Sequence, residues 1–351
     1  MKKYISKIHK KVTKSEQTVD DHVAQAVRIT NETVAEHREE VLSSARKYIY
    51  PLQQSKHKIV IVTTAIFITV IVAFFSYTTL ALYKIKSNSS FLYGVTRVVP
   101  FPIARTGSNF VAYENYLFEL RHYIHYYERQ QKVDFRSESG QQQLDQFKKR
   151  ALDKVVNDAY IKQLAREKGI TVSDAEVDAE IHIVRIQNRL GENDKVFEDV
   201  LKEYWGWSVD DFKRSLRQQK LAQKLLPILD PEAVAKIEDA QKELKNGVEF
   251  SDVAKKYSDD VSSKDNGGEY GFAVDKSNRD IAVQTTEALF KLNPGEVSDI
   301  VNTGYTLEIV KNIETQGDKI RAAHISCSFK EIGIYLNDYK DKHKAKLYIR
   351  L

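Results

Sequence analysis

The chain has 351 residues, 42% apolar and 29% charged, which is enough for two or three folded domains and excludes a fully disordered chain or a membrane protein with many spans. Its single cysteine, Cys327, excludes an internal disulfide and a cysteine-based metal site. The whole net charge of +5 lies in residues 1–58, so the neutral remainder lacks the basic face that a nucleic-acid partner requires.

Residues 1–58 form a basic tail with two possible roles. Six lysines fall within the first 14 residues, and Ile5, Ile8 and Val12 recur among them at helical spacing. One interpretation is an amphipathic helix that lies on anionic lipid. The other is a solvated, partly helical tail whose lysines only fix the membrane topology. Pro51 is expected to interrupt the helical pattern before the next segment.

Residues 59–83 are 25 residues without a charge, and they predict one transmembrane helix. A helix of this length is roughly 37 Å long, enough to cross a hydrocarbon layer of about 30 Å. A cleaved signal peptide is disfavoured, because the apolar run is too long and the tail before it is much longer than a signal peptide allows. Within a similar distance of the segment, five Lys and Arg lie before it (Arg38, Arg46, Lys47, Lys56 and Lys58) and three lie after it (Lys84, Lys86 and Arg97), and the six lysines near the N-terminus reinforce this bias. We therefore predict a single-pass cell-membrane protein with a cytoplasmic N-terminus and its large C-terminal body outside.

Two regions follow the membrane segment. Residues 84–112 contain Pro100 and Pro102 and show no helical period, which predicts an extended linker. Residues 113–230 predict an all-helical domain after a polar break near residues 137–140. The sequence signals of this domain are a long helix over residues 141–168, a left-handed cap at Gly169, capping boxes at Ser173–Glu176 and Ser208–Asp211, and a helix end at Pro227.

Residues 231–351 predict a small α+β domain. Its expected elements are helices over residues 234–246 and 251–257, a polar loop over 258–268, and strands over 297–301, 305–313 and 319–326. A turn over residues 315–318 would join the last two strands as a hairpin, and a helix over 329–345 would pack on the edge of the sheet.

The ordered motifs in this last region resemble the parvulin-type peptidyl-prolyl isomerase domain. They are AQKEL (240–244), GVEFSDVAKKYSDD (247–260), GGEYGF (267–272), EALF (287–290), LNPGEVS (292–298) and TGY (303–305). The helical domain before it is similar, more loosely, to the N-terminal chaperone domain of membrane- or lipid-anchored PrsA/SurA-type foldases. The resemblance therefore implies an α+β multidomain protein with a transmembrane helix, a SurA-N-like helical module and a small antiparallel-sheet parvulin domain.

One strand of the family pattern is out of order. The family begins its domain with a strand reading RASHIL, but no histidine precedes Val234 here, and the nearest match is IRAAHIS at residues 320–326. In the family fold the first and last strands are neighbours, so a hairpin could deliver this strand into the same position. We expect a circular permutation, which is tolerated where domain termini lie close together. The alternative, a second truncated copy, is disfavoured because only 31 residues follow Ile320.

The resemblance implies a set of site residues. Asp260 takes the family's acidic position and His324 its first histidine, while Glu308 stands where the family has its second histidine. Ile281 and Thr285 align with the pocket methionine and phenylalanine. Phe272 and Phe290 are the other residues expected to bind substrate. No cofactor is implied.

The sequence leaves three functional alternatives open. Thr285 in place of an aromatic residue removes apolar contact for proline. Glu308 near Asp260 is expected to repel it, which would raise the pKa of one carboxyl or force a rearrangement. The chain is then a slow or altered isomerase for exported proteins, or a catalytically inactive chaperone that binds unfolded polypeptides. A tethered structural protein is a third class.

The helical domain contains two other candidate features. His122 and His125 are three residues apart and could reach one metal ion, but the aromatic residues around them favour an ordinary helix face. Trp205 and Trp207 could hold an apolar client side chain, although tryptophan at a helix corner more often serves packing. We predict no metal site.

Overall fold

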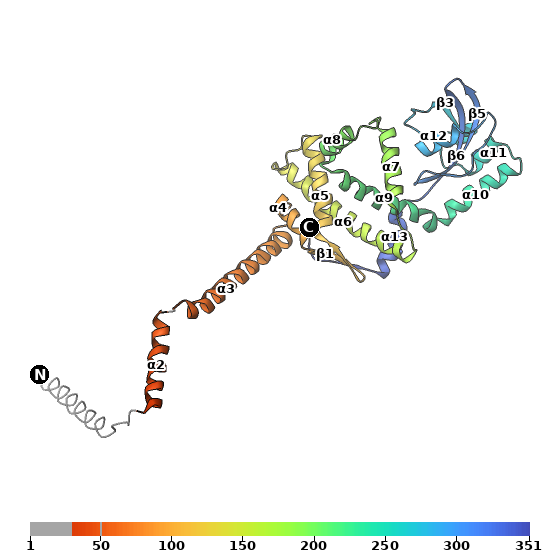
Figure 1. Cartoon of the computed structure of the whole chain (residues 1–351). Helices are drawn as coiled ribbons and strands as arrows, with labels where there is room; N and C mark the ends of the chain where they lie inside the picture. The colour runs from red at the N-terminus through yellow and green to blue at the C-terminus, as the bar shows by residue number, and fades with distance from the viewer. Residues whose placement is uncertain (1–29, 50) are drawn as a thin grey trace. The chain divides into compact units, whose positions relative to one another are not determined.

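A computed structural model describes residues 30–49 and 51–351, which divide into two units, Met1–Thr78 and Thr79–Leu351 (Figure 1). The two interpretations of the lysine-rich tail depend on residues 1–29, which lie outside the described part of the chain.

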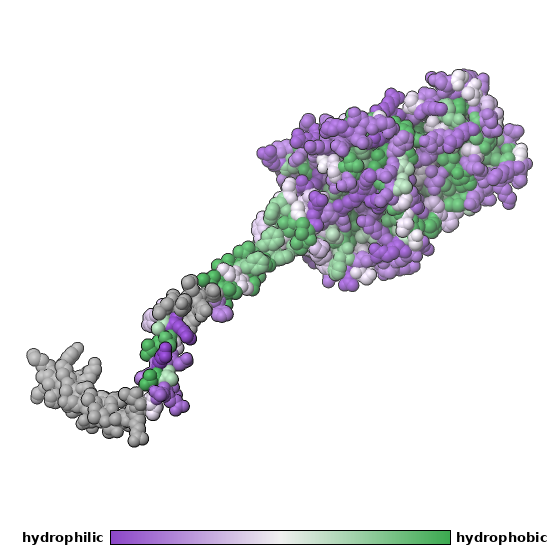
Figure 2. Space-filling model, viewed as in Figure 1, coloured by the Kyte–Doolittle hydropathy of each residue, from purple (hydrophilic) through white to green (hydrophobic). Residues whose placement is uncertain are grey.

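The first unit is helical where it is described. It contains α2 (Asn31–Ile49) and α3 (Pro51–Thr79), so Pro51 stands at a first helical position, as the predicted interruption requires. A short π-helix, η1 (Leu80–Lys84), continues α3. Figure 2 shows the hydrophobic surface of α3. Among the described residues, His57–Lys84 is a helix long and apolar enough to cross a membrane, judged by length and composition alone, and its most apolar 18 residues have a mean hydropathy of 2.7.

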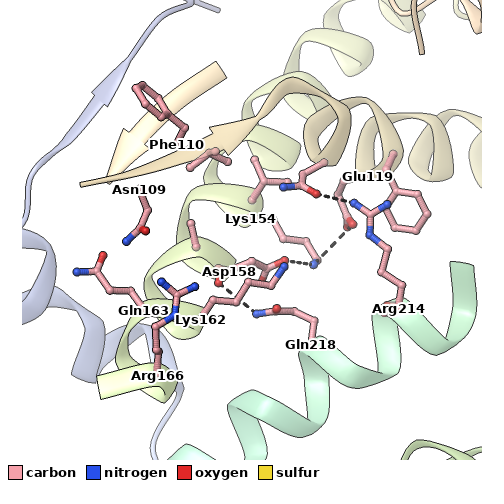
Figure 3. A pocket seen from close by; sticks show the side chains of 16 residues that line it. Asn109, Phe110, Glu119, Lys154, Asp158, Lys162, Gln163, Arg166, Arg214 and Gln218 are labelled. Carbon is pink, nitrogen blue, oxygen red and sulfur yellow. Dashed lines mark hydrogen bonds and ion pairs between the residues drawn. The ribbon is translucent and has the colours of Figure 1, made fainter. Parts of the chain in front are cut away.

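The second unit begins with a helical module. Its elements are α4 (Ser90–Val98), β1 (Pro102–Thr106), β2 (Asn109–Ala112), α5 (Tyr113–Arg129), α6 (Glu138–Glu167), α7 (Asp174–Gln187), α8 (Asp194–Trp205) and α9 (Val209–Leu229). Between α5, α6 and α9 lies a cavity of about 290 Å³ (Figure 3).

Residues 84–112 are not the extended linker that the sequence predicts, because α4 and the β1–β2 hairpin form there. Leu92, Ile103 and Val111 are buried in the same core as α5 and α6.

The local signals inside this module are largely confirmed. Both capping boxes form, at Ser173–Glu176 and Ser208–Asp211, and Gly169 has the expected left-handed backbone. The predicted break between helices is present but lies earlier in the chain, because α5 ends at Arg129 and Ser137 already caps α6. Pro227 does not end α9, which continues to Leu229.

The module is not purely helical, and the end of the chain belongs to it. Strand β7 (Ala345–Leu347) pairs with β1 and gives a three-stranded antiparallel sheet of order β2-β1-β7. Helix α13 (Ile332–Lys342) packs on α6 and α9, where Leu336 is buried beside Leu225. The predicted position of this helix at the edge of the parvulin-like sheet is therefore wrong. Short strands that pair across the length of the chain leave no local sequence signal.

Between α9 and α13 the chain forms the small antiparallel-sheet domain. Its elements are α10 (Pro231–Lys245), α11 (Phe250–Tyr257), η2 (Lys264–Asn266), β3 (Glu269–Asp275), α12 (Val283–Leu289), β4 (Val301–Asn302), β5 (Thr306–Gln316) and β6 (Lys319–Ser328). The sheet order is β3-β6-β5-β4. The predicted strand over 297–301 is confirmed only at its ends, where Val297 makes an isolated bridge to Lys311 and Val301 begins β4. The β5–β6 hairpin is confirmed.

The two faces of this sheet have different coverings. Side chains alternate along each strand, so Ala323, Ile325 and Cys327 point to the core with α10 and α11. Ile320 and Ala322 point to the opposite core, which is shared with α12. His324 follows the second alternation and therefore belongs to the α12 face of the sheet.

Candidate active site

The β5–β6 register brings two of the expected site residues to one face. Val310 is paired with His324, and Glu308 is paired with Ser326. His324 and Glu308 are therefore diagonal neighbours on the α12 face, a position from which long side chains can reach a common ligand.

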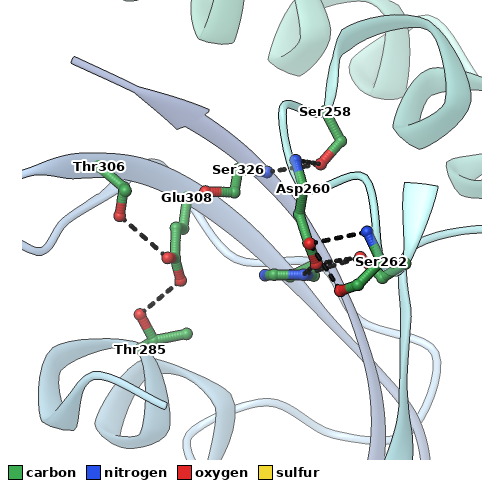
Figure 4. Close-up of polar contacts among 9 residues, drawn as sticks. Ser258, Asp260, Ser262, Thr285, Thr306, Glu308 and Ser326 are labelled. Carbon is green, nitrogen blue, oxygen red and sulfur yellow. Dashed lines mark hydrogen bonds and ion pairs between the residues drawn. The ribbon is translucent and has the colours of Figure 1, made fainter. Parts of the chain in front are cut away.

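The loop after α11 delivers the third expected residue to the same strand. The Asp259 N–H donates to the Ser326 carbonyl over 2.7 Å, and the Ser326 N–H donates to Ser258 Oγ over 3.2 Å. These two bonds hold the loop against β6, and they place Asp260 beside the His324 ring, with Glu308 on the neighbouring strand (Figure 4).

Asp260 and His324 form a direct polar contact. His324 Nε2 lies 2.8 Å from Asp260 Oδ2. The other carboxylate oxygen, Oδ1, accepts from the Ser262 N–H over 3.0 Å and from Ser262 Oγ over 2.6 Å, and Ser263 Oγ donates to Oδ2. Partial burial acts to raise the pKa of Asp260, but the hydrogen bonds from Ser262, Ser263 and His324 outweigh it and hold that pKa well below its usual value.

This contact determines which ring nitrogen of His324 carries a proton. Because an ionised carboxylate only accepts hydrogen bonds, Nε2 must carry the proton that is donated to Asp260. The other nitrogen, Nδ1, is buried without a hydrogen-bond partner among the described residues. The imidazole is thus fixed in position from one side only.

Tyr270 covers the His324 ring, and no sequence motif indicated this contact. The two ring centroids are 4.2 Å apart with the rings inclined by 35°. The Tyr270 hydroxyl is buried, and no described residue bonds to it. Burial raises the pKa of Tyr270, and the negative charges of Glu308 and Asp260 raise it further. The Tyr270 hydroxyl therefore stays protonated, and it is a hydrogen-bond donor without an acceptor among the described residues.

Glu308 is bound differently from the expectation. Its carboxylate accepts from Thr285 Oγ1 over 2.7 Å and from Thr306 Oγ1 over 3.0 Å. The predicted repulsion between Glu308 and Asp260 does not raise the pKa of Asp260, which is lowered instead. Glu308 is bound by two threonine hydroxyls, whereas Asp260 is bound by Ser262, Ser263 and His324, so each carboxylate has its own hydrogen-bond donors. Thr306 was not anticipated from the sequence.

The remaining expected pocket residues lie around Tyr270. Phe272 is 43% exposed, and its ring centroid is 5.8 Å from that of Tyr270. Ile281 is buried in the core shared with α12, and Phe290 packs against the same core. Thr285 is fully buried. Of these residues only Phe272 presents a large open surface, so substrate contact by Ile281, Thr285 and Phe290 stays a prediction.

The histidine pair of the helical module serves packing. His122 stacks on Trp207 with the ring centroids 4.4 Å apart, and His125 Nε2 lies 2.9 Å from the Glu203 carbonyl. Trp205 packs on His122 in the same cluster. Within the described residues, no group of three or more His, Cys, Asp or Glu side chains is arranged to hold a metal ion.

Two family models match the chain, a SurA-like N-terminal domain over residues 52–226 and a PPIC-type PPIase domain over residues 229–314. The foldase protein PrsA of Caldanaerobacter subterraneus subsp. tengcongensis is 30% identical over 192 residues, which are 49% of this chain and 59% of that protein. PrsA of Bacillus subtilis is 34% identical over 131 residues, 37% of this chain and 40% of that protein. The chain thus spans less than two thirds of the length of these relatives.

A solved structure, the foldase protein PrsA from Streptococcus pneumoniae, is 23% identical and covers 55% of this chain and 74% of that one, with a TM-score of 0.20. A score of this size gives no residue-level correspondence.

Proposed function

Because the chain belongs to the PrsA/SurA-type parvulins, with a SurA-like N-terminal domain followed by a PPIC-type PPIase domain, we propose that it is a membrane-anchored foldase that isomerises prolyl bonds of exported polypeptides. The observation that carries the proposal is the contact between His324 and Asp260 on the α12 face of the parvulin-type sheet. Its clients are unfolded or proline-containing polypeptides, and its reaction requires no cofactor.

The site suits a reaction that breaks no covalent bond. Rotation about an X–Pro bond has to overcome a barrier of about 18–20 kcal/mol that comes from amide resonance. Such a site needs an apolar surface for the proline ring and fixed polar groups beside the rotating amide. Phe272 and Tyr270 supply the apolar surface, and the Tyr270 hydroxyl, His324 and Asp260 supply the polar groups. Glu308 adds a carboxylate on the Thr285 side of the site.

The domain is a circular permutation of the parvulin order, with β6 in the place of the family's first strand. Two observations support this. The PPIase match ends at residue 314, before β6 begins at Lys319. Strand β6 nevertheless lies inside the sheet, with β5 on one side and β3 on the other, and it carries the histidine that the family has on its first strand. A permuted order costs little, because a two-residue turn is enough to connect β5 to β6.

The apolar helix anchors the protein, with its N-terminus in the cytoplasm and the two folded domains outside. The 28-residue length of His57–Lys84 and the excess of Lys and Arg before it support this orientation. Protease added to intact spheroplasts should then digest residues after Lys84 and leave the N-terminal tail protected. Protection of the C-terminal domains instead would show that the protein has the opposite orientation.

The competing function is a holdase without catalysis, and the buried Thr285 in place of a pocket aromatic residue favours it. A protease-coupled assay on a proline tetrapeptide and an aggregation assay on an unfolded client, both with the full chain in detergent, separate the two. Isomerisation above the uncatalysed rate supports the foldase. Suppression of aggregation without any isomerisation would leave only the holdase.

A further inference from the structure

The cavity of about 290 Å³ in the helical module is lined by more cations than anions. Four cations line it, Lys154, Lys162, Arg166 and Arg214, against two anions, Glu119 and Asp158 (Figure 3). It belongs entirely to the second unit, and it shares no lining residue with the His324 site.

The two anions are already neutralised. Lys154 Nζ lies 2.9 Å from Asp158 Oδ2 and 3.6 Å from Glu119 Oε2. Arg214 binds Glu114 from outside the cavity through both of its terminal nitrogens, each over 2.8 Å. The close ion pairs of Glu119, Asp158 and Glu114 are therefore made with Lys154 and Arg214, and Asp158 and Glu114 act on Lys162 only at longer range.

Lys162 and Arg166 are the other two cations, and no ion pair involving either forms among the described residues. They are four residues apart on α6, so they share one face of the helix, at the rim of the cavity. Two neighbouring cations that make no close ion pair can together bind a carboxylate.

The cavity also holds two hydrogen-bond acceptors without donors. Gln163 Oε1 and Gln218 Oε1 are buried, and no described residue bonds to them. Their orientation is fixed, because the Nε2 groups donate to Glu167 Oε1 and to the Asp158 carbonyl. A buried acceptor without a donor is costly, so a ligand that brings N–H groups gains from entering.

An edge strand completes the lining. Strand β2 is at the edge of the sheet of order β2-β1-β7, and Asn109, Phe110 and Val111 of this strand line the cavity. Phe110 is 64% exposed and offers an apolar contact. An edge strand can accept an extended peptide by backbone pairing.

Carboxylate-binding cations, N–H acceptors, an exposed aromatic ring and an edge strand are the complement of an extended acidic peptide. We propose that this cavity binds an extended client segment that carries Asp or Glu side chains, with the carboxylate between Lys162 and Arg166. The identity of the ligand as a client rests on the proposed function, but its chemistry rests on the cavity alone.

The test is fluorescence anisotropy with two labelled ten-residue peptides, one acidic and one basic, which share the same apolar residues and contain no proline. The full chain in detergent is titrated into each peptide at low salt. We expect the acidic peptide to bind and the basic one to bind at least about tenfold more weakly. Neither peptide contains proline, so the measured affinities do not depend on whether the chain has isomerase activity.

The decisive variant is Lys162→Glu/Arg166→Glu, and the matched control is Lys149→Glu/Lys168→Glu, which makes the same charge change at exposed positions of α6 and its C-cap. The cavity variant should lose at least about tenfold in affinity for the acidic peptide, and the control should stay within about twofold. Circular dichroism of both checks that they fold. Equal losses in the two variants, or equal binding of the two peptides, would overturn the proposal and leave only a bulk charge effect.

Discussion

The hydrogen bonds from Ser262, Ser263 and His324 hold the pKa of Asp260 low. The same bonds therefore stabilise the folded protein wherever Asp260 is ionised. Asp260→Asn should lower the free energy of unfolding by about 1–2 kcal/mol at pH 7, because an amide accepts these bonds less strongly than a carboxylate. Urea unfolding measures the change, and Asp265→Asn, an exposed position in the same loop, is the control.

The same variant has a defined pH dependence. The folded pKa of Asp260 lies below the unfolded value of about 3.9, so the stabilisation is complete above that pH and is lost as the pH falls towards the folded pKa. The difference between wild type and Asp260→Asn should therefore shrink as the pH falls below about 4. A difference that stays the same or grows below pH 4 would contradict the assigned hydrogen bonds.

A second prediction concerns the reactivity of the Cys327 thiol. Burial on β6 raises the pKa of its thiol to about 11, and since only the thiolate reacts, the folded protein should modify slowly. As the chain's only cysteine, it can be followed directly with Ellman's reagent at pH 8. The reaction should be rapid in 8 M urea and much slower without it; equal rates would show that the strand is open.

The sequence predicts the residues of the site better than their partners. Asp260 and His324 were expected together because a hairpin would return the last strand to the sheet, and they are in contact. Tyr270 and Ser263 were not anticipated, because ring stacking and loop hydroxyls depend on three-dimensional packing and leave no periodic signal.

At the scale of elements, the junction between β3 and β6 depends on Gly268. A Cβ atom at this position would lie 2.4 Å from the His324 carbonyl oxygen. Gly268→Ala should therefore displace the strand that carries His324 and cost at least about 2 kcal/mol more than Gly271→Ala. Gly271 also has a positive φ but has no atom near its added Cβ, so strain from φ is common to both. Urea unfolding of both variants measures this difference, and equal costs would mean that the close approach is absent.

Helices with local caps were predictable and pairings distant in sequence were not. The boxes at Ser173 and Ser208 depend on residues three apart, and both form. Strand β1, in contrast, has β2 as a neighbour on one side and β7 from the end of the chain on the other, so residues 84–112 looked like a linker. Such short strands are stabilised by tertiary contacts rather than by propensity.

At the scale of the whole molecule, the last twenty residues belong to the helical module. Leu336 on α13 is fully buried against α6 and α9, whereas Ile334 on the same helix is 55% exposed. Leu336→Ala should lower the free energy of unfolding by about 2–5 kcal/mol, and Ile334→Ala by less than about 0.5 kcal/mol. Urea unfolding followed by tryptophan fluorescence reports on this module, which contains both tryptophans, Trp205 and Trp207. Similar small losses in both variants would mean that α13 is not docked.

The central claim is that β6 supplies the histidine of a working prolyl isomerase site. The most direct test is kcat/KM for a proline tetrapeptide in the protease-coupled assay, for wild type, His324→Ala and the control His182→Ala on exposed α7. We predict that His324→Ala loses at least about tenfold while remaining folded, and that His182→Ala matches wild type. A folded His324→Ala protein with full activity would contradict the account.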